Sequence, residues 1–349
     1  MTSPLGYYLA NLAVYFLVYC MLTMGLNISF GMTGILDFAF ITFMAVGAYI
    51  AGVTSLGPAT VSSQMSYVLG LNWPFPLPLI AGGIVAGLFG ALIGLLIMRR
   101  LRSDYLAIVL VATWSISWNL ASNITGLFNG TTGILNVPQP LSSTFNTDPN
   151  TYVYVFIPIA AICVVLFFIA AFCIERSPFG RALRAIRSDP DVAAAFGKHT
   201  LRLRLQAMMM GCMYAGLAGA LTILYIGAMN PSAWAIIETV IVFSALLVGG
   251  RGNVFGAILG ALLVRIVIIE GTGLLPQVPY HPELLGALRN IAIGVLIILV
   301  MYFRPQGVLP ERRRHYESES LGPAGRDLDS ASRSPRQSQA TGEAAHELA

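Results

Sequence analysis

Long apolar runs and short polar segments alternate along almost the whole chain. A bilayer core of about 30 Å requires about 20 apolar residues in an α-helix, and residues 79–98 form such a run without one ionisable side chain. Comparable windows lie at residues 7–28, 35–55, 78–98, 105–123, 152–174, 205–226, 234–250, 253–270 and 285–303. The pattern predicts an all-α, polytopic transmembrane helix bundle of about nine spans.

Glycine interrupts this pattern at residues 31–43 and 247–256. Irregular backbone is tolerated at membrane depth only where protein buries it or where it lines a cavity. Each segment is therefore a candidate broken or re-entrant element, with a plain helix end as the alternative. Small residues also recur at every fourth position, which predicts closely packed helices. These stripes are Gly83 with Gly87, Gly90 with Gly94, Gly211 with Ala215 and Gly219, and Gly252 with Gly256 and Gly260.

Basic residues gather in four of the segments that connect the apolar windows. They are Arg99, Arg100 and Arg102; Arg176, Arg181, Arg184, Arg187, Lys198, Arg202 and Arg204; Arg251; and Arg304, Arg312, Arg313 and Arg314. The other connections, at residues 56–77, 124–151, 227–233 and 271–284, contain no Lys or Arg. With nine spans all four basic segments fall on one side, and cytoplasmic loops retain positive charge. We expect a multi-pass protein of the cell (inner) membrane with the N-terminus outside and the C-terminus in the cytoplasm.

Composition supports the membrane assignment and excludes other classes. Hydrophobic residues make up 56% of the chain and charged residues 10%, whereas ordinary soluble domains carry about 25% charged residues. The net charge of +4 does not indicate nucleic-acid binding, because the basic residues lie at the ends of apolar runs and form no stripe with aromatic residues. The four cysteines lie inside apolar runs without metal-ligand spacing, so we expect neither a metal site nor disulfides.

The chain changes character after the last apolar window. From His315 onward it consists mainly of Ser, Gly, Ala, Arg and Glu, with almost no large apolar residue. Such a segment cannot bury enough surface to order itself. We expect a transmembrane domain at residues 1–304, which includes a cytoplasmic loop at 175–204, and a largely disordered cytoplasmic tail at residues 305–349.

The loop is too polar to span the membrane and carries two helix-start signals. Its sequence from residue 176 to 204 is RSPFGRALRAIRSDPDVAAAFGKHTLRLR. Ser177 before Pro178, and Asp189 before Pro190, each place an N-cap residue before a proline at the first helical position. Gly197 suits a helix end. We therefore predict two short helices at the cytoplasmic surface.

The first of these helices has one basic and one apolar face. Arg181, Arg184 and Arg187 recur at every third position, beside Leu183 and Ile186. One interpretation is an interfacial helix whose arginines contact anionic lipid headgroups, which composition alone favours. The other is a docking element for a soluble partner protein.

Several motifs together resemble those of branched-chain amino acid ABC permeases of the LivM/LivH type. The matching segments are GLNISFGMTGILDFAFITFMAVGAYIAG from residue 25, RSPFGRALRAIR from 176, AAAFG from 193, AGLAGAL from 215, LLVGGRGNVFGAILGALLV from 246 and RPQGVLP from 304. They extend in register over most of residues 20 to 310. In that family the loop inserts into a cleft of the ATPase subunit. The resemblance therefore implies a coupling role for the loop.

Carried over residue by residue, the resemblance implies that nine residues of the loop contact the ATPase. These are Ser177, Pro178, Gly180, Arg181, Arg184, Arg187, Ala193, Ala194 and Gly197. The chain departs from the family at Pro190 and Asp191, where glutamate often precedes the alanine pair. A nucleotide-binding G-x-x-x-x-G-K-[ST] loop is not present, because GKHT at 197–200 lacks the first glycine and the hydroxyl after lysine. We expect no cofactor on this chain, with ATP and Mg on partner ATPase subunits.

Ionisable and polar residues inside the apolar windows are candidates for a translocation path, because an unpaired charge in lipid costs several kcal/mol. The candidates are Asn27, Asp37, Thr42, Glu238 and Arg265. The alternative is structural: Arg265 would pair with Asp37 or Glu238, and Glu270 would lie at the interface.

The resemblance implies a permease subunit of an ABC importer for branched-chain amino acids or a similar small solute. Its partners would be two ATPase subunits, a second related permease, an extracytoplasmic solute-binding protein and membrane lipid, with no nucleic acid. Urea, short amides and other amino acids are alternative solutes. A stand-alone secondary transporter or channel is the alternative function, supported by the intramembrane carboxylates. No nucleophile–base pair indicates an enzyme.

Overall fold

The computed structural model describes residues 4–58, 67, 69–99, 103–141, 151–271, 283–304 and 306–310. Within this part the chain is helical, and the only β contacts are two isolated bridges, Tyr67 with Phe128 and Ile134 with Met229. The α-helices are α1 (Pro4–Leu26), α2 (Phe40–Ser55), α3 (Leu77–Met98), α4 (Ser103–Asn123), α5 (Thr125–Phe128), α7 (Tyr152–Arg176), α8 (Pro178–Ser188), α9 (Pro190–Ala195), α10 (Thr200–Ile226), α11 (Ile236–Gly249), α12 (Val254–Leu262) and α14 (Glu283–Phe303). Short 3₁₀ or π segments are η1 (Asn27–Gly31), η3 (Gly130–Thr132), η4 (Pro231–Trp234) and η5 (Leu263–Glu270).

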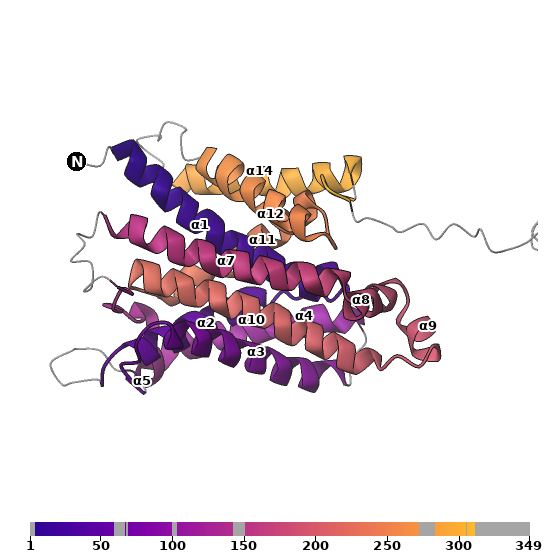
Figure 1. Cartoon of the computed structure of the whole chain (residues 1–349), viewed down its shortest axis with the longest axis horizontal. Helices are drawn as coiled ribbons and strands as arrows, with labels where there is room; N and C mark the ends of the chain where they lie inside the picture. The colour runs from indigo at the N-terminus through magenta and orange to yellow at the C-terminus, as the bar shows by residue number, and fades with distance from the viewer. Residues whose placement is uncertain are drawn as a thin grey trace, which may run out of the picture. The chain divides into compact units, whose positions relative to one another are not determined.

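The long helices run side by side along one axis, as in a membrane-spanning bundle (Figure 1). Seven of them are long and apolar enough to cross a membrane, and two shorter apolar helices lie at Phe40–Ser55 and Val254–Val267. Together these nine elements coincide with the nine apolar windows. The structure confirms the all-α polytopic bundle, and the count of nine spans stays a prediction.

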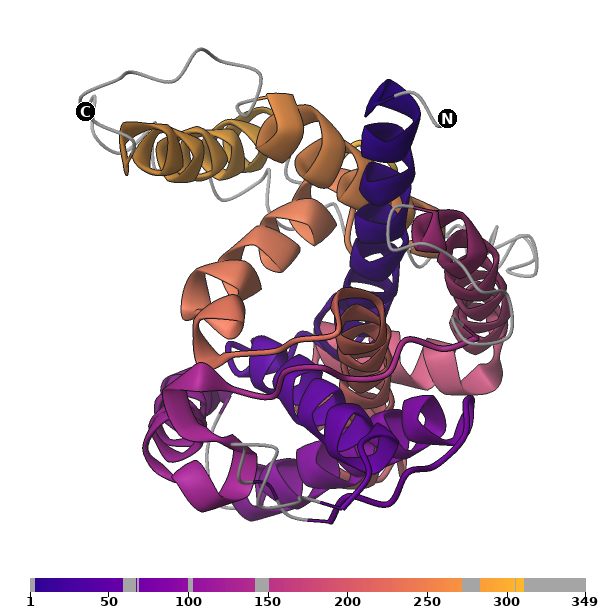
Figure 2. The same cartoon turned by 90° about the vertical axis from the view of Figure 1, so that its left-hand side faces the viewer.

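Helix α10 forms the centre of the bundle. It packs against α3, α2 and α1, and it lies among them when the bundle is viewed along its axis (Figure 2). Most of its side chains are buried inside the chain, whereas very few of those of α14 are buried. Because lipid is as apolar as the helix surfaces, this packing depends on close contact between helices.

Glycines permit that contact. A Cβ atom on Gly219 of α10 would lie 1.9 Å from the carbonyl oxygen of Met44 on α2, and one on Gly47 would lie 2.2 Å from that of Gly216. A Cβ on Gly260 of α12 would lie 1.8 Å from the carbonyl oxygen of Ala245 on α11. The predicted close packing at small-residue stripes is confirmed.

The first glycine-rich segment breaks a helix. Helix α1 continues as the π-helical η1 to Gly31, residues 32–39 are not helical, and α2 begins at Phe40. The expected broken element is therefore present, but residues 35–39, which the apolar pattern assigned to a span, lie in the irregular part. Gly34 has φ +78°, a conformation that glycine adopts without strain.

The second glycine-rich segment is a tight turn between α11 and α12, with φ +119° at Gly250 and +82° at Gly252. The chain after α14 returns to this turn, where the N–H of Val308 donates to the carbonyl of Val248 and that of Leu309 to Gly249, both at 2.9 Å. Residues 306–310 thus pack against α11. Residues 311–349 lie outside the described part, and the predicted division at residue 304 stays a prediction.

The basic segments come together at one end of the bundle. The end of α3, which carries Arg99, approaches the start of α10, since a Cβ on Gly94 would meet Leu205 at 3.0 Å. The Glu175 carboxylate, beside the loop at 176–204, accepts a hydrogen bond from the N–H of Val254, next to the Arg251 turn. The segment after Arg304 is tied to the same turn. This arrangement agrees with the charge pattern, and which side of the membrane it faces stays a prediction.

Candidate functional site

The loop between α7 and α10 contains the two predicted short helices, α8 and α9. The Ser177 hydroxyl caps α8 by accepting from the N–H of Gly180 at 3.2 Å. One carboxylate oxygen of Asp189 caps α9 by accepting from the N–H groups of Asp191 at 2.9 Å and Val192 at 3.0 Å. A proline occupies the first turn of each helix. The Ser-Pro and Asp-Pro signals therefore operate as predicted.

The apolar face of α8 packs against the protein. Leu183 and Ile186 are fully buried. A Cβ atom on Gly180 would lie 2.4 Å from the carbonyl oxygen of Ile174 and 2.8 Å from that of Glu175. Helix α8 is therefore seated directly on the end of α7, and only glycine fits at position 180.

The three arginines of α8 have different surroundings. Arg181 is exposed, whereas Arg184 and Arg187 are partly buried. The Arg184 guanidinium donates to the carbonyl of Glu175, and the Arg187 guanidinium donates to the carbonyl of Gly31 at the end of η1. These two arginines attach α8 to the transmembrane helices. The proposed contacts of all three with an ATPase stay predictions.

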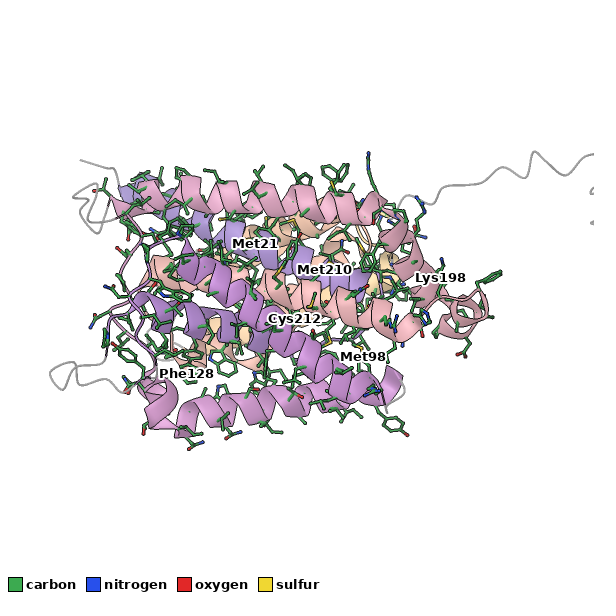
Figure 3. All side chains as sticks on the ribbon, turned by 60° about the horizontal axis from the view of Figure 1, so that its bottom comes forward. Met21, Met98, Phe128, Lys198, Met210 and Cys212 are labelled. Carbon is green, nitrogen blue, oxygen red and sulfur yellow. The ribbon has the colours of Figure 1, made fainter. Side chains whose placement is uncertain are left out.

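The tip of the loop is an exposed apolar surface. Val192 is 51% exposed and Phe196 is 81% exposed, while Ala193 is buried beneath them. Ala194 is exposed, and Gly197 follows with φ +74°. The loop, which includes Lys198, projects from one end of the bundle (Figure 3). The sequence interpretation omitted Phe196, although a large aromatic residue between alanines and glycine was a usable signal.

We expect Asp189→Ala to loosen α9 without unfolding the bundle. The substitution removes the acceptor for two N–H groups at the helix start, which costs about 1 kcal/mol of local stability. Amide hydrogen exchange over residues 190–197 should become faster, while exchange in α10 stays unchanged. Asp189→Asn is the control, because asparagine caps nearly as well. Unchanged exchange in Asp189→Ala would contradict the capping role.

Two further hydrogen bonds join this end of the bundle to its interior. The Oδ1 atom of Asn27 in η1 accepts from the N–H of Gly252 at 2.8 Å. The carboxylate of Glu175 at the end of α7 accepts from the N–H of Val254 at 3.0 Å. Together with the Arg187 contact on Gly31, these bonds connect α8, η1 and the α11–α12 turn.

Three of the predicted path residues lie at the helix break. Asn27, Asp37 and Thr42 are fully buried. Within the described residues, both carboxylate oxygens of Asp37, the Thr42 hydroxyl and the Asn27 Nδ2 have no hydrogen-bond partner. Buried polar atoms without partners are uncommon and mark places where a water, ion or ligand is accommodated. Their role in a path stays a prediction.

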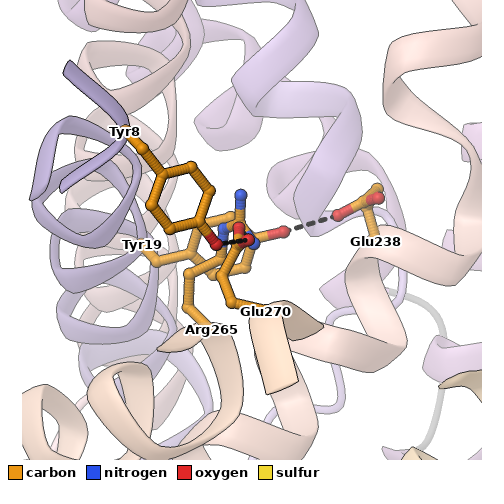
Figure 4. Close-up of polar contacts among 5 residues, drawn as sticks. All are labelled: Tyr8, Tyr19, Glu238, Arg265 and Glu270. Carbon is orange, nitrogen blue, oxygen red and sulfur yellow. Dashed lines mark hydrogen bonds and ion pairs between the residues drawn. The ribbon is translucent and has the colours of Figure 1, made fainter. Parts of the chain in front are cut away.

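The other two path residues belong to a separate polar cluster (Figure 4). The Tyr19 hydroxyl donates to Glu238 at 2.7 Å, and the Tyr8 hydroxyl donates to Glu270 at 2.8 Å. The Arg265 guanidinium forms an ion pair with Glu270 at 2.9 Å. The structure thus brings Glu238 and Arg265 together around Tyr19.

Arg265 does form an ion pair, as the structural alternative expects, but not with either of the suggested carboxylates. Its ion-pair partner is Glu270, and neither Asp37 nor Glu238 pairs with it. The π-helical geometry of η5 accounts for this choice, because it places residues five apart in the chain next to each other. In the described part of the chain no group of three or more His, Cys, Asp or Glu side chains could hold a metal ion.

Comparison with known proteins gives one family. The family model described as "Branched-chain amino acid transport system / permease component" matches residues 8–301. No solved structure matches the chain significantly.

Curated relatives agree with this match. The high-affinity branched-chain amino acid transport system permease protein LivM of Salmonella typhimurium is 28% identical over 89% of this chain and 72% of its own length. A probable LivM of Methanocaldococcus jannaschii is 26% identical over 87% and 94%, respectively. The LivH permease protein of Salmonella typhimurium is 22% identical over 83% and 91%. The chain is therefore a multi-pass membrane protein that belongs to the family of branched-chain amino acid transport permease components.

Proposed function

We propose that this chain is the membrane-spanning permease subunit of an ABC importer for branched-chain amino acids or a similar small solute. A binding protein outside the cytoplasmic membrane would deliver the solute, and ATP hydrolysis on two separate subunits would drive its passage. The observation that carries the proposal is the exposed apolar tip at Phe196, presented on a loop whose base is fixed to α7 and η1.

The geometry of the loop favours a protein partner over lipid. An interfacial helix needs a free apolar face, but Leu183 and Ile186 of α8 are buried against the chain itself. Two of its arginines donate to backbone carbonyls. What remains exposed is a compact tip of Val192, Ala194 and Phe196, and exposed apolar patches of this kind mark interaction sites.

The remaining partners follow from the relatives. Permease proteins named LivM and proteins named LivH both match this chain, which supports pairing with a second related permease. The gathering of the basic segments at one end supports a cytoplasmic location for α8 and α9, with the N-terminus outside. We place the complex in the cell (inner) membrane.

The tip provides the test of this proposal. The chain would be purified from native membranes in mild detergent and its companions identified, for the wild type, Phe196→Asp and His199→Asp. His199→Asp is the matched control because it adds the same charge nearby, at the N-cap of α10, where aspartate is favoured. We expect a P-loop ATPase and a second permease with the wild type and the control.

In Phe196→Asp the ATPase should fall at least about tenfold while the second permease remains, because an aromatic anchor is replaced by a charge. Equal ATPase recovery in Phe196→Asp would exclude the tip as the docking element. A solitary chain in every mild preparation would contradict the importer.

A stand-alone secondary transporter is the second candidate. It is favoured by one observation, the fully buried Asp37 carboxylate without a hydrogen-bond partner among the described residues, since such groups mark ion and proton sites in membranes. Uptake that follows an ion gradient and persists after ATP is depleted would support this function over the first.

A further inference from the structure

A polar cluster extends along α1 in the direction away from α8 and α9. Tyr19 is about 18 Å along α1 from Gly31, where Arg187 is attached, and so lies near the middle of the helix, whereas Tyr8 is about 35 Å away, at 1.5 Å rise per residue. The Tyr8 hydroxyl contacts Glu270, the Tyr19 hydroxyl contacts Glu238, and Arg265 lies beside Tyr19 (Figure 4). In the proposed orientation the cluster reaches from mid-depth toward the outer side, from which a solute delivered by a binding protein enters.

Tyr19 joins the acidic and basic sides of the cluster. Its hydroxyl donates to Glu238 at 2.7 Å, and the Arg265 guanidinium carbon lies 5.5 Å from the centroid of its ring. A second ring, that of Tyr15, lies 5.0 Å from the same guanidinium carbon. Cation–π contacts and the Glu270 ion pair therefore fix the position of the guanidinium.

The charges of the cluster do not balance. Arg265 is paired with Glu270, whereas Glu238 has no ion-pair partner among the described residues and one hydrogen bond, from Tyr19. Arg265 has five N–H donors, and in the described part of the chain only its Nη1 donates a hydrogen bond. These spare atoms are not among the fully buried ones without partners, so a carboxylate acceptor and guanidinium donors remain accessible, both next to Tyr19.

An apolar surface adjoins these charges. Tyr19 packs against a small hydrophobic cluster of α11, η5 and α14, which is separate from the main core. Its buried members are Ile241, Ala245, Val248, Val264 and Ile293, and its accessible part consists of partly buried side chains that pack against them: Leu263, Ile269, Leu296, Ile297 and Val300. The site therefore combines a free carboxylate, a fixed guanidinium and an aliphatic surface within one part of the bundle.

We propose that Glu238, Arg265 and Tyr19 form a transient binding site for a zwitterionic, aliphatic α-amino acid. Glu238 accepts hydrogen bonds from the ammonium group, the free N–H groups of Arg265 donate to the carboxylate, and the side chain lies on the Tyr19 ring and the adjoining aliphatic surface. Glu270 is a positioning residue that holds Arg265. This inference rests on the proposed function, because it names the solute class that such a permease carries.

Two alternatives explain less of the geometry. A lipid-facing cluster would leave the Glu238 charge in hydrocarbon without a counter-charge, at a cost of several kcal/mol. A purely structural ion pair requires only Arg265 and Glu270, and it does not explain why Glu238 lies nearby with an accessible carboxylate oxygen. A ligand with one positive and one negative group satisfies both the acceptor and the donors.

Uptake in the native cells is the first test. The chromosomal copy would be replaced by Glu238→Gln, Arg265→Gln or Tyr154→Phe, and the initial rate of radiolabelled leucine uptake would be measured. We expect the first two to lower uptake at least about tenfold, since each removes one charge-assisted interaction. Tyr154→Phe, the control, should stay near wild type because Tyr154 is an exposed residue of α7, outside the polar cluster. Full uptake in Glu238→Gln would overturn the inference and leave the proposed function intact.

Ligand selectivity is the second test, because a structural role would not change it. The full chain in lipid nanodiscs, with the subunits that co-purify, would be heated with leucine, leucinamide or isocaproate, and the melting temperature recorded. Leucine should raise it most in the wild type, since each of the other two lacks one charge. In Glu238→Gln, leucine and isocaproate should become equivalent. Equal effects of all three on the wild type would overturn the site, whereas a solitary chain in every mild preparation would reject the proposed function itself.

Discussion

Replacing Gly219 with valine is expected to abolish accumulation of the folded chain. A Cβ atom at this position would lie 1.9 Å from the carbonyl oxygen of Met44, and a backbone carbonyl cannot rotate out of the way as a side chain can. Helices α10 and α2 would have to separate. Overpacking of this kind costs about 1–3 kcal/mol or more, and lipid provides no hydrophobic force that would hold the separated helices together.

The measurement is the amount of monodisperse chain after extraction in mild detergent, followed by fluorescence-detected gel filtration. Gly260→Val should behave like Gly219→Val, because its Cβ would lie 1.8 Å from the Ala245 carbonyl oxygen. Gly294→Val is the matched control, since nothing lies within 4 Å of the corresponding Cβ on α14. If Gly219→Val accumulated to the level of Gly294→Val, the close packing of α2 on α10 would be wrong.

The bundle could be predicted from sequence because lipid imposes a simple rule. Every span needs a long apolar run, and every described helix that could cross the membrane lies in one of the expected windows. Residues 35–39 were assigned wrongly, since hydropathy does not distinguish an apolar helix from apolar irregular backbone after Gly34. The packing of residues 306–310 on α11 was also missed, because backbone hydrogen bonds at Val308 and Leu309 leave no side-chain signal.

In the loop, too, local features could be predicted from the sequence and long-range contacts could not. Its two helices were predictable, because the N-caps of Ser177 and Asp189 act within three residues. The inward contacts of Arg184 and Arg187 could not be predicted, because both guanidinium groups donate to backbone carbonyls, which no residue type signals. The Gly31 carbonyl that accepts from Arg187 is also 156 residues away in the chain. The Arg265–Glu270 pair was missed for a related reason, since a spacing of five residues suits a π-helix and does not suit an α-helix.

Loss of the Arg187 contact is expected to uncouple ATP hydrolysis from transport, so that hydrolysis continues while solute uptake falls. Arg187 donates to the carbonyl of Gly31, and Asn27 in the same η1 segment accepts from the N–H of Gly252. We therefore expect a movement of α8 to reach the broken helix and the α11–α12 turn. In Arg187→Ala we expect the tip around Phe196 to stay exposed, whereas the hydrogen bond from α8 to η1 is lost.

The measurement of this uncoupling is the ratio of solute uptake to ATP hydrolysis in proteoliposomes that contain the co-purified complex. We expect Arg187→Ala to lower the ratio at least about tenfold while ATPase recovery stays unchanged, because the charge-assisted hydrogen bond to the Gly31 carbonyl is lost. Arg181→Ala is the matched control, since it removes the same charge from an exposed position on the same helix. Equal losses in both variants would show that the charge of α8 matters and the attachment does not. Loss of the ATPase from Arg187→Ala would instead make Arg187 a docking residue.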